Sequence, residues 1–193
     1  MKKSFRNVLG LIAFSFFSLA HAGFNEGMDS YTHGDYPSAL KEFQSLADSG
    51  NRYAQFNLGV MYALGQGVQK DEKTAVALYR KAAEQGLAMA QFNLGQAYEE
   101  AAGVSLDEAL ALNWYRKAAE QDYPRAQFNL GLMYARGEGV KPDLVQAYKW
   151  FHLAALGGAP YAERNRDNAE KHMTAKQIDQ AMALARSWVP KNM

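Results

Sequence analysis

The sequence contains no cysteine and only four histidines, and these two shortages exclude much side-chain chemistry. Without cysteine the chain cannot form disulfides, thiolate-ligated zinc sites, iron–sulfur clusters or a thiol nucleophile. His33, His152 and His172 are scattered, and none stands in the H-x-x-x-H spacing typical of a metal site on a helix. The nucleophile motif G-x-S-x-G and the phosphate-binding glycine motifs are also missing. We therefore expect no catalytic residue, no metal and no cofactor.

The sequence also lacks a surplus of either charge. It carries 21 basic and 20 acidic residues, a formal net charge of +1. Three of the basic residues, Lys2, Lys3 and Arg6, lie in the first segment, and without them 18 basic residues face 20 acidic ones. A near-neutral chain of this kind lacks the positive field that draws proteins to nucleic acids or anionic lipids. We expect no nucleic-acid partner.

The first 22 residues are typical of a secretory signal peptide. The basic start is followed by a short apolar stretch from Val8 to Leu19, and Ala20-His21-Ala22 supplies small residues where signal peptidase cleaves. Spanning a membrane takes roughly 20 apolar residues, more than this stretch provides. We expect cleavage after Ala22, a periplasmic or secreted product, and no stable membrane insertion afterwards. A buried N-terminal helix is the alternative interpretation.

The rest of the chain repeats with a period of 36 residues. The hexapeptide A-Q-F-N-L-G begins at Ala54, at Ala90 and again at Ala126. Other positions keep the same phase: the tyrosines Tyr62, Tyr98 and Tyr134, the glycines Gly67, Gly103 and Gly139, and the aspartates Asp71, Asp107 and Asp143. Agreement at so many positions is the mark of a repeat protein.

Each period has the pattern of two helices. Ala54, Leu58 and Tyr62 are four residues apart and share one face of the first helix. Gly59 within it costs about 1 kcal/mol relative to alanine, which indicates a close approach of a neighbouring helix. Asp71 is placed to cap the second helix. That helix carries an apolar stripe of Ala75, Leu78, Tyr79, Ala82 and Ala83.

The combined pattern resembles the Sel1-like repeat family, a slightly longer relative of the tetratricopeptide repeat. The resemblance covers residues 52–158, with departures at Ala101 and Asp122, where the family pattern has glycine. It implies an all-α fold, a right-handed superhelical solenoid of antiparallel helix pairs. The two departures leave the shape of those turns open.

Four segments follow from these patterns. Residues 1–22 form the signal peptide, 23–51 a tetratricopeptide-like helix pair that lacks the longer loop, 52–158 three Sel1-like repeats, and 159–193 the C-terminal capping helices. Thr174 with Gln177 predicts a capping box at the start of a final helix. Ile178, Met182, Ala185 and Trp188 would then cover the last open face of the stack.

The first helices of such a stack line its concave side, so their non-core face is the predicted binding surface. The predicted partner-binding residues are Tyr53, Phe56, Asn57, Asn93, Gln96, Glu99, Glu100, Arg125, Asn129, Leu132 and Arg136. Some of these positions are the same in each repeat. Others change from apolar through acidic to basic, as expected of a surface that fits one protein partner.

The repeated phenylalanines and asparagines allow two interpretations. A row of asparagines at Asn57, Asn93 and Asn129 could hold a partner's backbone, because the amide both donates and accepts hydrogen bonds. In related tetratricopeptide grooves, asparagines at the equivalent position do hold peptides. Alternatively, the asparagines bond neighbouring repeats and the phenylalanines Phe56, Phe92 and Phe128 fill the space between helices.

The resemblance implies a non-catalytic protein-binding role, and three functions remain open. The first is a scaffold, adaptor or regulator in the bacterial envelope. The second is a periplasmic immunity protein that neutralises a phospholipase-type effector delivered between bacteria by type VI secretion, a role known for similar proteins. The third is an enzyme acting on the cell wall, as reported for cysteine-rich relatives. The missing cysteines and scattered histidines argue against the third.

Overall fold

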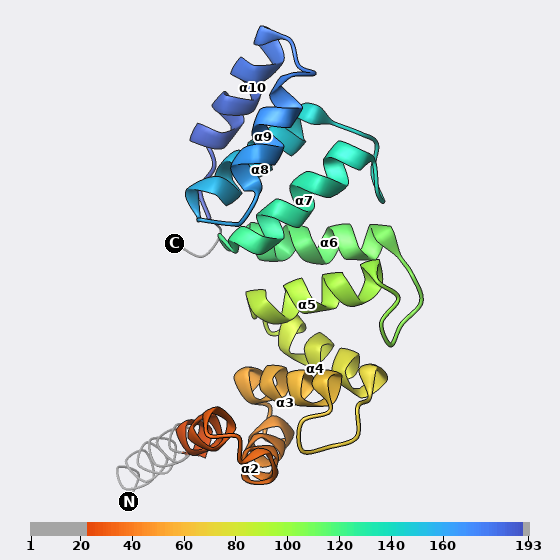
Figure 1. Ribbon diagram of the computed structural model, residues 1–193, viewed down its shortest axis with the longest axis vertical. Coiled ribbons are helices and arrows are strands. Elements are labelled where there is room, and N and C mark those ends of the chain that lie inside the picture. Colours follow the sequence, from red (N-terminus) through yellow and green to blue (C-terminus); the bar gives the residue numbers. More distant parts are fainter. Residues whose placement is uncertain (1–22, 191–193) are drawn as a thin grey trace, which may run out of the picture. The chain divides into compact units, whose positions relative to one another are not determined.

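The computed structural model describes residues 23–190, and all their regular structure is helical, as the repeat pattern predicts (Figure 1). Residues 23–32 are helical. The labelled helices that follow are α2 (Tyr36–Asp48), α3 (Arg52–Leu64), α4 (Glu72–Glu84), α5 (Ala88–Glu99), α6 (Glu108–Ala119), α7 (Pro124–Arg136), α8 (Leu144–Leu156), α9 (Ala162–Glu170) and α10 (Ala175–Arg186). Within residues 23–190 we find no helix with the length and apolar character needed to cross a membrane. The predicted signal peptide lies outside the described residues.

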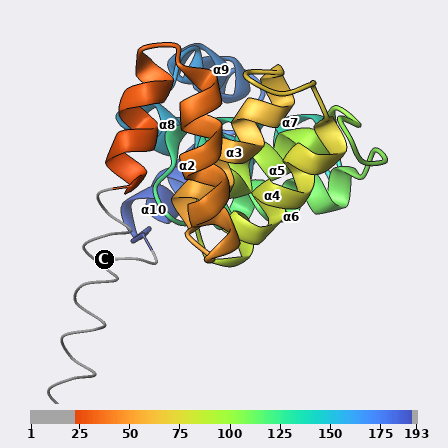
Figure 2. The same ribbon diagram turned by 90° about the horizontal axis from the view of Figure 1, so that it is seen from below.

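The chain divides into two compact units, and the first ends at Leu78, inside α4. In this unit α2 and α3 lie side by side (Figure 2). Its core consists of Ala39, Phe43, Leu46, Ala47, Ala54, Leu58 and Met61. Asn51 caps α3, because its side-chain oxygen accepts hydrogen bonds from the backbone amides of Tyr53 and Ala54, both at 3.0 Å.

The second unit begins at Tyr79 and contains the remaining helices, with α5 packed on α6 and α7 on α8 (Figure 1). Its main core cluster consists of Phe92, Ala111, Leu112, Tyr115, Ala118, Ala119, Ala126, Leu130, Met133, Trp150, Leu153 and Ala185. Alanines make up five of these twelve residues. Small side chains of this kind let helices approach closely.

Two helical glycines make the closest of these approaches possible. A Cβ atom on Gly95 would lie 2.8 Å from the Tyr115 ring, and one on Gly131 would lie 2.6 Å from the Phe151 ring. Both distances are far below van der Waals contact. The sequence prediction that the glycine of A-Q-F-N-L-G marks a close helix approach is confirmed for these two repeats.

The loop between the two helices of a repeat is closed in the same way each time. The backbone amides of Asp71, Asp107 and Asp143 donate to the carbonyls of Tyr62, Tyr98 and Tyr134 at 2.9–3.1 Å. Each aspartate then caps the second helix through its side chain, as predicted. The loop keeps its form even in the second repeat, where Ala101 replaces a glycine and adopts φ 56°. The turn at the end of that repeat also keeps its form, because Asp122 adopts φ 61° in place of a glycine.

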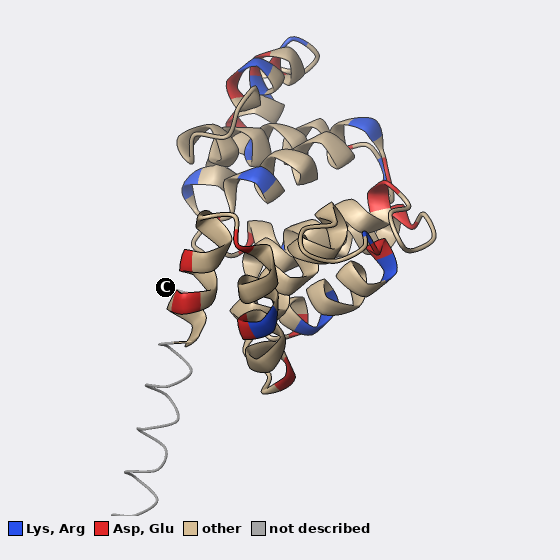
Figure 3. Cartoon of the chain, turned by 60° about the horizontal axis from the view of Figure 1, so that its bottom comes forward, with Lys and Arg blue, Asp and Glu red and all other residues tan. Residues whose placement is uncertain are grey.

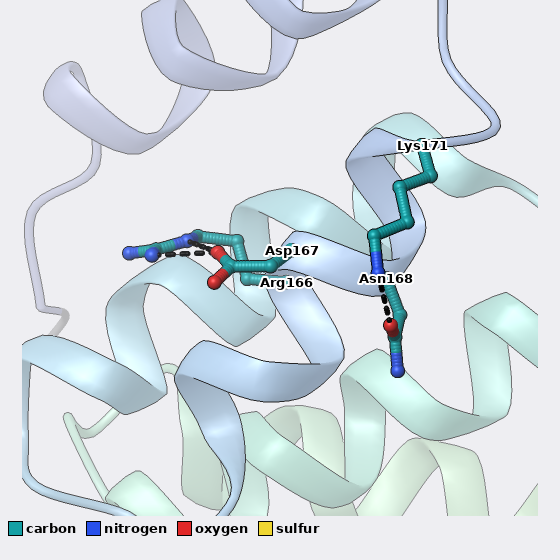
Figure 4. Close-up of polar contacts among 4 residues, drawn as sticks. All are labelled: Arg166, Asp167, Asn168 and Lys171. Atoms are coloured by element: carbon teal, nitrogen blue, oxygen red, sulfur yellow. Dashed lines mark hydrogen bonds and ion pairs between the residues drawn. The ribbon is translucent and has the colours of Figure 1, made fainter.

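The C-terminal helices cover the end of the second unit. Thr174 and Gln177 form the predicted capping box, with both hydrogen bonds present. From α10, Ala181 and Ala185 are buried, and Trp188 packs edge-on against Trp150 with ring centroids 6.2 Å apart. Two pairs of polar side chains in and just after α9 bond to each other: Arg166 donates to Asp167 at 2.7 Å, and Lys171 to Asn168 at 3.2 Å (Figure 4).

Candidate partner-binding groove

A groove of about 280 Å³ lies between α5, α7 and the turn that joins α8 to α9. It is lined by Phe92, Gln96, Arg125, Phe128, Asn129, Ala159, Pro160 and Tyr161. Three of the predicted partner-binding residues, Gln96, Arg125 and Asn129, therefore meet at one site. The three residues of the α8–α9 turn were missed by sequence reasoning.

The turn reaches the groove because Gly157 packs directly on Pro124. A Cβ atom on Gly157 would lie 2.5 Å from the Pro124 ring, so only glycine permits this contact. Four residues later Tyr161 adopts φ 63°, a conformation that costs a bulky residue roughly 1–2 kcal/mol. Its side chain is 73% exposed. The fold thus holds an exposed aromatic ring in an unfavourable backbone conformation at the edge of the groove.

The floor of the groove is aromatic. Phe92 is buried, with its ring centroid 5.6 Å from that of Tyr115 and 5.4 Å from that of Tyr123. Phe128 lies 5.8 Å from Phe151. Both phenylalanines also line the groove. They fill the space between helices and at the same time give the groove its apolar surface.

One end of the groove is bordered by a buried hydrogen-bond network. The hydroxyl of Tyr115 donates to the Glu99 carboxylate, and the Asn129 side chain lies near this hydroxyl. Burial raises the pKa of Tyr115 well above its usual range, and Glu99 adds to the rise. Asn129 thus lies near Tyr115 of the preceding repeat and also lines the groove.

Of the remaining predicted residues in the second unit, none lines the groove. Asn93 and Leu132 are half-buried, and Glu100 is exposed at the C-terminal end of α5. Arg136 pairs with Glu138 at 3.5 Å on the surface. These four residues remain predictions of the sequence.

Tyr53, Phe56 and Asn57 belong to the first unit. The exposed Tyr53 ring lies between the Arg52 guanidinium, 5.0 Å from its centroid, and the Phe24 ring at 6.1 Å. The Asn57 side chain donates to the backbone carbonyl of Tyr53 at 2.9 Å. Here the asparagine supports its own helix, and Phe56 is half-buried.

A row of buried glutamines was missed by sequence reasoning. The side chains of Gln55, Gln91 and Gln127 donate to the backbone carbonyls of Ala47, Ala83 and Ala119, each eight residues back. Each glutamine thus ties a first helix to the end of the helix before it. The sequence contains a pattern that predicts this burial: Gln55 stands four residues before the buried Gly59 and therefore lies on the same face of α3.

Within residues 23–190, no group of three or more histidine, cysteine, aspartate or glutamate side chains could hold a metal ion. Acidic and basic residues are scattered over the helices and the loops between them (Figure 3). The features that distinguish the groove are its aromatic rings and its one cation, Arg125.

Comparison with solved structures places the chain among helical repeat proteins. It is 36% identical to a Sel1 repeat protein from Oxalobacter formigenes, with a TM-score of 0.71 over 74% of this chain and 59% of the other. It is 33% identical to a protective antigen of uropathogenic Escherichia coli with an SLR fold, with a TM-score of 0.62 over 89% of this chain and 46% of the other. The chain thus spans about half the length of these relatives. A MamA protein, 20% identical with a TM-score of 0.50 over 88% of this chain and 96% of the other, shares the fold alone.

The family assignment rests on the repeats themselves. None of the curated proteins compared with the chain matches it. The Sel1 repeat family model matches three times in succession, at residues 52–87, 88–123 and 124–158, which together make up more than half of the sequence. The chain therefore belongs to the Sel1 repeat family.

Proposed function

We propose that the chain is an exported, non-catalytic module that binds a protein partner through the groove between α5, α7 and the α8–α9 turn. Sel1 repeats generally mediate contacts between proteins. The observation that carries the proposal is Tyr161, an exposed aromatic held at positive φ on the edge of an apolar groove beside Arg125. Tyrosine and arginine are the side chains most enriched among binding anchors. Backbone strain of this kind gathers at functional sites.

Photo-crosslinking in the native host tests this proposal. The full chain carries a photoreactive phenylalanine analogue in place of Tyr161, and a matched variant carries it at Leu106, which is 60% exposed in the same unit but outside the groove. We expect one defined protein adduct from position 161, identified by mass spectrometry, and none from position 106. Equal adducts from both positions, or none from position 161, would contradict the proposal.

Export is part of the proposal and has its own test. The basic start, short apolar stretch and Ala20-His21-Ala22 support cleavage after Ala22. We expect the protein in the periplasmic fraction or the medium, with an intact mass that begins at Gly23. A cytoplasmic protein that retains Met1 would show that this segment is not a signal peptide.

Two kinds of partner fit this module. The first is an envelope protein that the chain scaffolds or regulates, and this is the function that we propose. The alternative is immunity, in which the partner is an interbacterial phospholipase-type effector. Co-expression separates the two, because an immunity protein restores growth to cells that produce the effector in the periplasm. Continued killing despite co-expression would exclude immunity to that effector and leave the scaffold role in place.

A further inference from the structure

The groove carries a single charge, and it is positive. Arg125 is the only charged side chain among the residues that line it. It is exposed, and no residue within 23–190 forms an ion pair or hydrogen bond with its guanidinium. Arg116 in the same unit differs, because it donates to the Tyr134 hydroxyl at 3.1 Å. Arg125 thus keeps its planar set of donors for a group outside the chain.

The electrostatic surroundings of Arg125 favour an anion at that end of the groove. Arg125 stands in the first turn of α7, whose N-cap residue Tyr123 supplies no side-chain hydrogen bond, so the positive end of the helix dipole adds to its charge. One turn further along α7, Asn129 borders the Tyr115–Glu99 pair. The Glu99 carboxylate lies beyond the residues that line the groove, and its negative charge would repel a second anion at that end.

The apolar part of the groove matches one large side chain. The volume of the whole groove, about 280 Å³, lies just under the range of roughly 300–1,000 Å³ usual for small-molecule pockets. Phe92 and Phe128 form its floor, and Tyr161 stands at its edge. Aromatic rings prefer tilted contacts with other rings at centroid distances of roughly 4.5–7 Å, which this arrangement can offer an incoming ring.

We propose that the groove recognises a protein segment in which a large aromatic side chain stands next to an acidic one. The aromatic side chain enters between Phe92, Phe128 and Tyr161, and the carboxylate pairs with the guanidinium of Arg125. Gln96 and Asn129 bring amide groups within the same groove, suited to the backbone of the segment. This inference rests on the proposed function and adds the chemistry of the partner.

The test uses three capped peptides of glycine and serine that differ only in a central pair: Trp-Asp, Trp-Lys or Ala-Asp. Each is titrated into the full-length protein and followed by backbone-amide NMR, which detects weak binding. We expect the Trp-Asp peptide to shift the amides of α5, α7 and the α8–α9 turn, and to bind at least about tenfold more tightly than the other two. Equal binding of Trp-Asp and Trp-Lys, or no binding of Trp-Asp, would overturn the proposal.

Charge reversal provides the sharper control. Arg125→Glu should invert the preference, so that Trp-Lys binds more tightly than Trp-Asp. Lys141→Glu, an equal change at an exposed site outside the groove, should leave the preference unaltered. An unperturbed amide spectrum in the absence of peptide establishes that both variants are folded. An unchanged preference in Arg125→Glu would show that Arg125 does not select the ligand.

The photo-crosslinking experiment separates this inference from the proposed function. If position 161 crosslinks one protein in wild type and equally in Arg125→Glu, the groove binds a partner but not through an acidic residue, and only the present inference fails. If position 161 gives no adduct in either protein, the proposed function fails as well. If the adduct is lost in Arg125→Glu and kept in Lys141→Glu, both are supported.

Discussion

The second and third repeats share a motif, but the buried glutamine of this motif has more hydrogen-bond partners for its side-chain oxygen in the second repeat than in the third. In the second repeat the Gln91 side chain donates to Ala83 and accepts from Gln121 at 2.7 Å. In the third, Gln127 is 0% exposed and donates to Ala119, yet its side-chain oxygen has no partner among the described residues. The reason is that Gly157 occupies the position one period after Gln121. Glycine there allows the contact with Pro124 that places the α8–α9 turn at the groove. The third repeat thus lacks this internal hydrogen bond beside the proposed groove.

The largest effect on stability should come from the close contact between a helical glycine and an aromatic ring, which both repeats share. Gly95→Val and Gly131→Val would each force a side chain into the ring of Tyr115 or Phe151, and we expect each to lower the free energy of unfolding by about 3 kcal/mol. Urea denaturation followed by circular dichroism measures this. Ala183→Val, at an exposed position in α10, controls for the helix propensity of valine. A loss no greater than that of the control would show that the helices can separate at little cost.

The two glutamines should differ when each is replaced by leucine. Gln91→Leu removes the hydrogen bond to the Ala83 carbonyl and the one from the Gln121 amide, and we expect a loss of roughly 2 kcal/mol. Gln127→Leu removes the hydrogen bonds to the Ala119 carbonyl and to the Asp122 carboxylate, but Asp122 is exposed and can bond to water instead. Because the variant also removes a buried oxygen that has no partner among the described residues, its loss should be about 1 kcal/mol smaller. Both values come from urea denaturation. Equal losses would mean that the unpaired oxygen of Gln127 carries no cost.

Tyr115 is a further difference, because the third repeat has Phe151 at the equivalent position. Tyr115→Phe removes the hydrogen bond to Glu99, and we expect a loss of about 1 kcal/mol at neutral pH. The pKa of Tyr115 is raised in the folded protein, so its contribution is full below the unfolded value of about 10 and falls as pH rises above it. Unfolding curves between neutral pH and pH 11 should therefore decline less steeply in Tyr115→Phe than in wild type. Tyr161→Phe, which leaves Tyr115 intact, should decline as wild type does.

The last effect, no larger than that of Tyr115→Phe, should be a gain in the free energy of unfolding. Ala101 adopts the positive φ that glycine takes at the equivalent Gly137, and Ala101→Gly should raise the free energy of unfolding by roughly 1 kcal/mol. Ala109→Gly, at an exposed site within α6, should lower it by about the same amount. Thermal and urea unfolding both report the sign. Destabilisation by Ala101→Gly would contradict the assignment of strain at this turn.

Much of the fold follows from local sequence patterns, because its determinants are close together in the chain. The aspartate caps, the capping box at Thr174 and the close approaches at Gly95 and Gly131 each depend on residues within one helix pair. The sequence also predicts that Gln96, Arg125 and Asn129 lie on the exposed face of the first helices. The spacing of these residues relative to the core positions of each helix was enough for that prediction.

The remainder of the groove could not be predicted, because it depends on contacts between segments far apart in sequence. Tyr161 follows a break in the repeat pattern, and its place at the groove depends on Gly157 meeting Pro124 across 33 positions of sequence. The position of a residue along a helix also does not predict that Arg136 pairs with Glu138, whereas Arg125 has no partner among residues 23–190. Side-chain pairing is decided in three dimensions.

The arginine–tyrosine hydrogen bonds bear on how genes for such proteins change length. Arg80 donates to Tyr98 at 2.8 Å and Arg116 to Tyr134 at 3.1 Å, each across 18 positions of sequence. If recombination removed residues 81–116, one whole period, Arg80 would face Tyr134 in place of Tyr98 and the same bond could form. Deletion of a length that is not a whole number of periods would put the two side chains out of phase. Within the repeats, this geometry therefore tolerates gain or loss of coding sequence only in steps of one period.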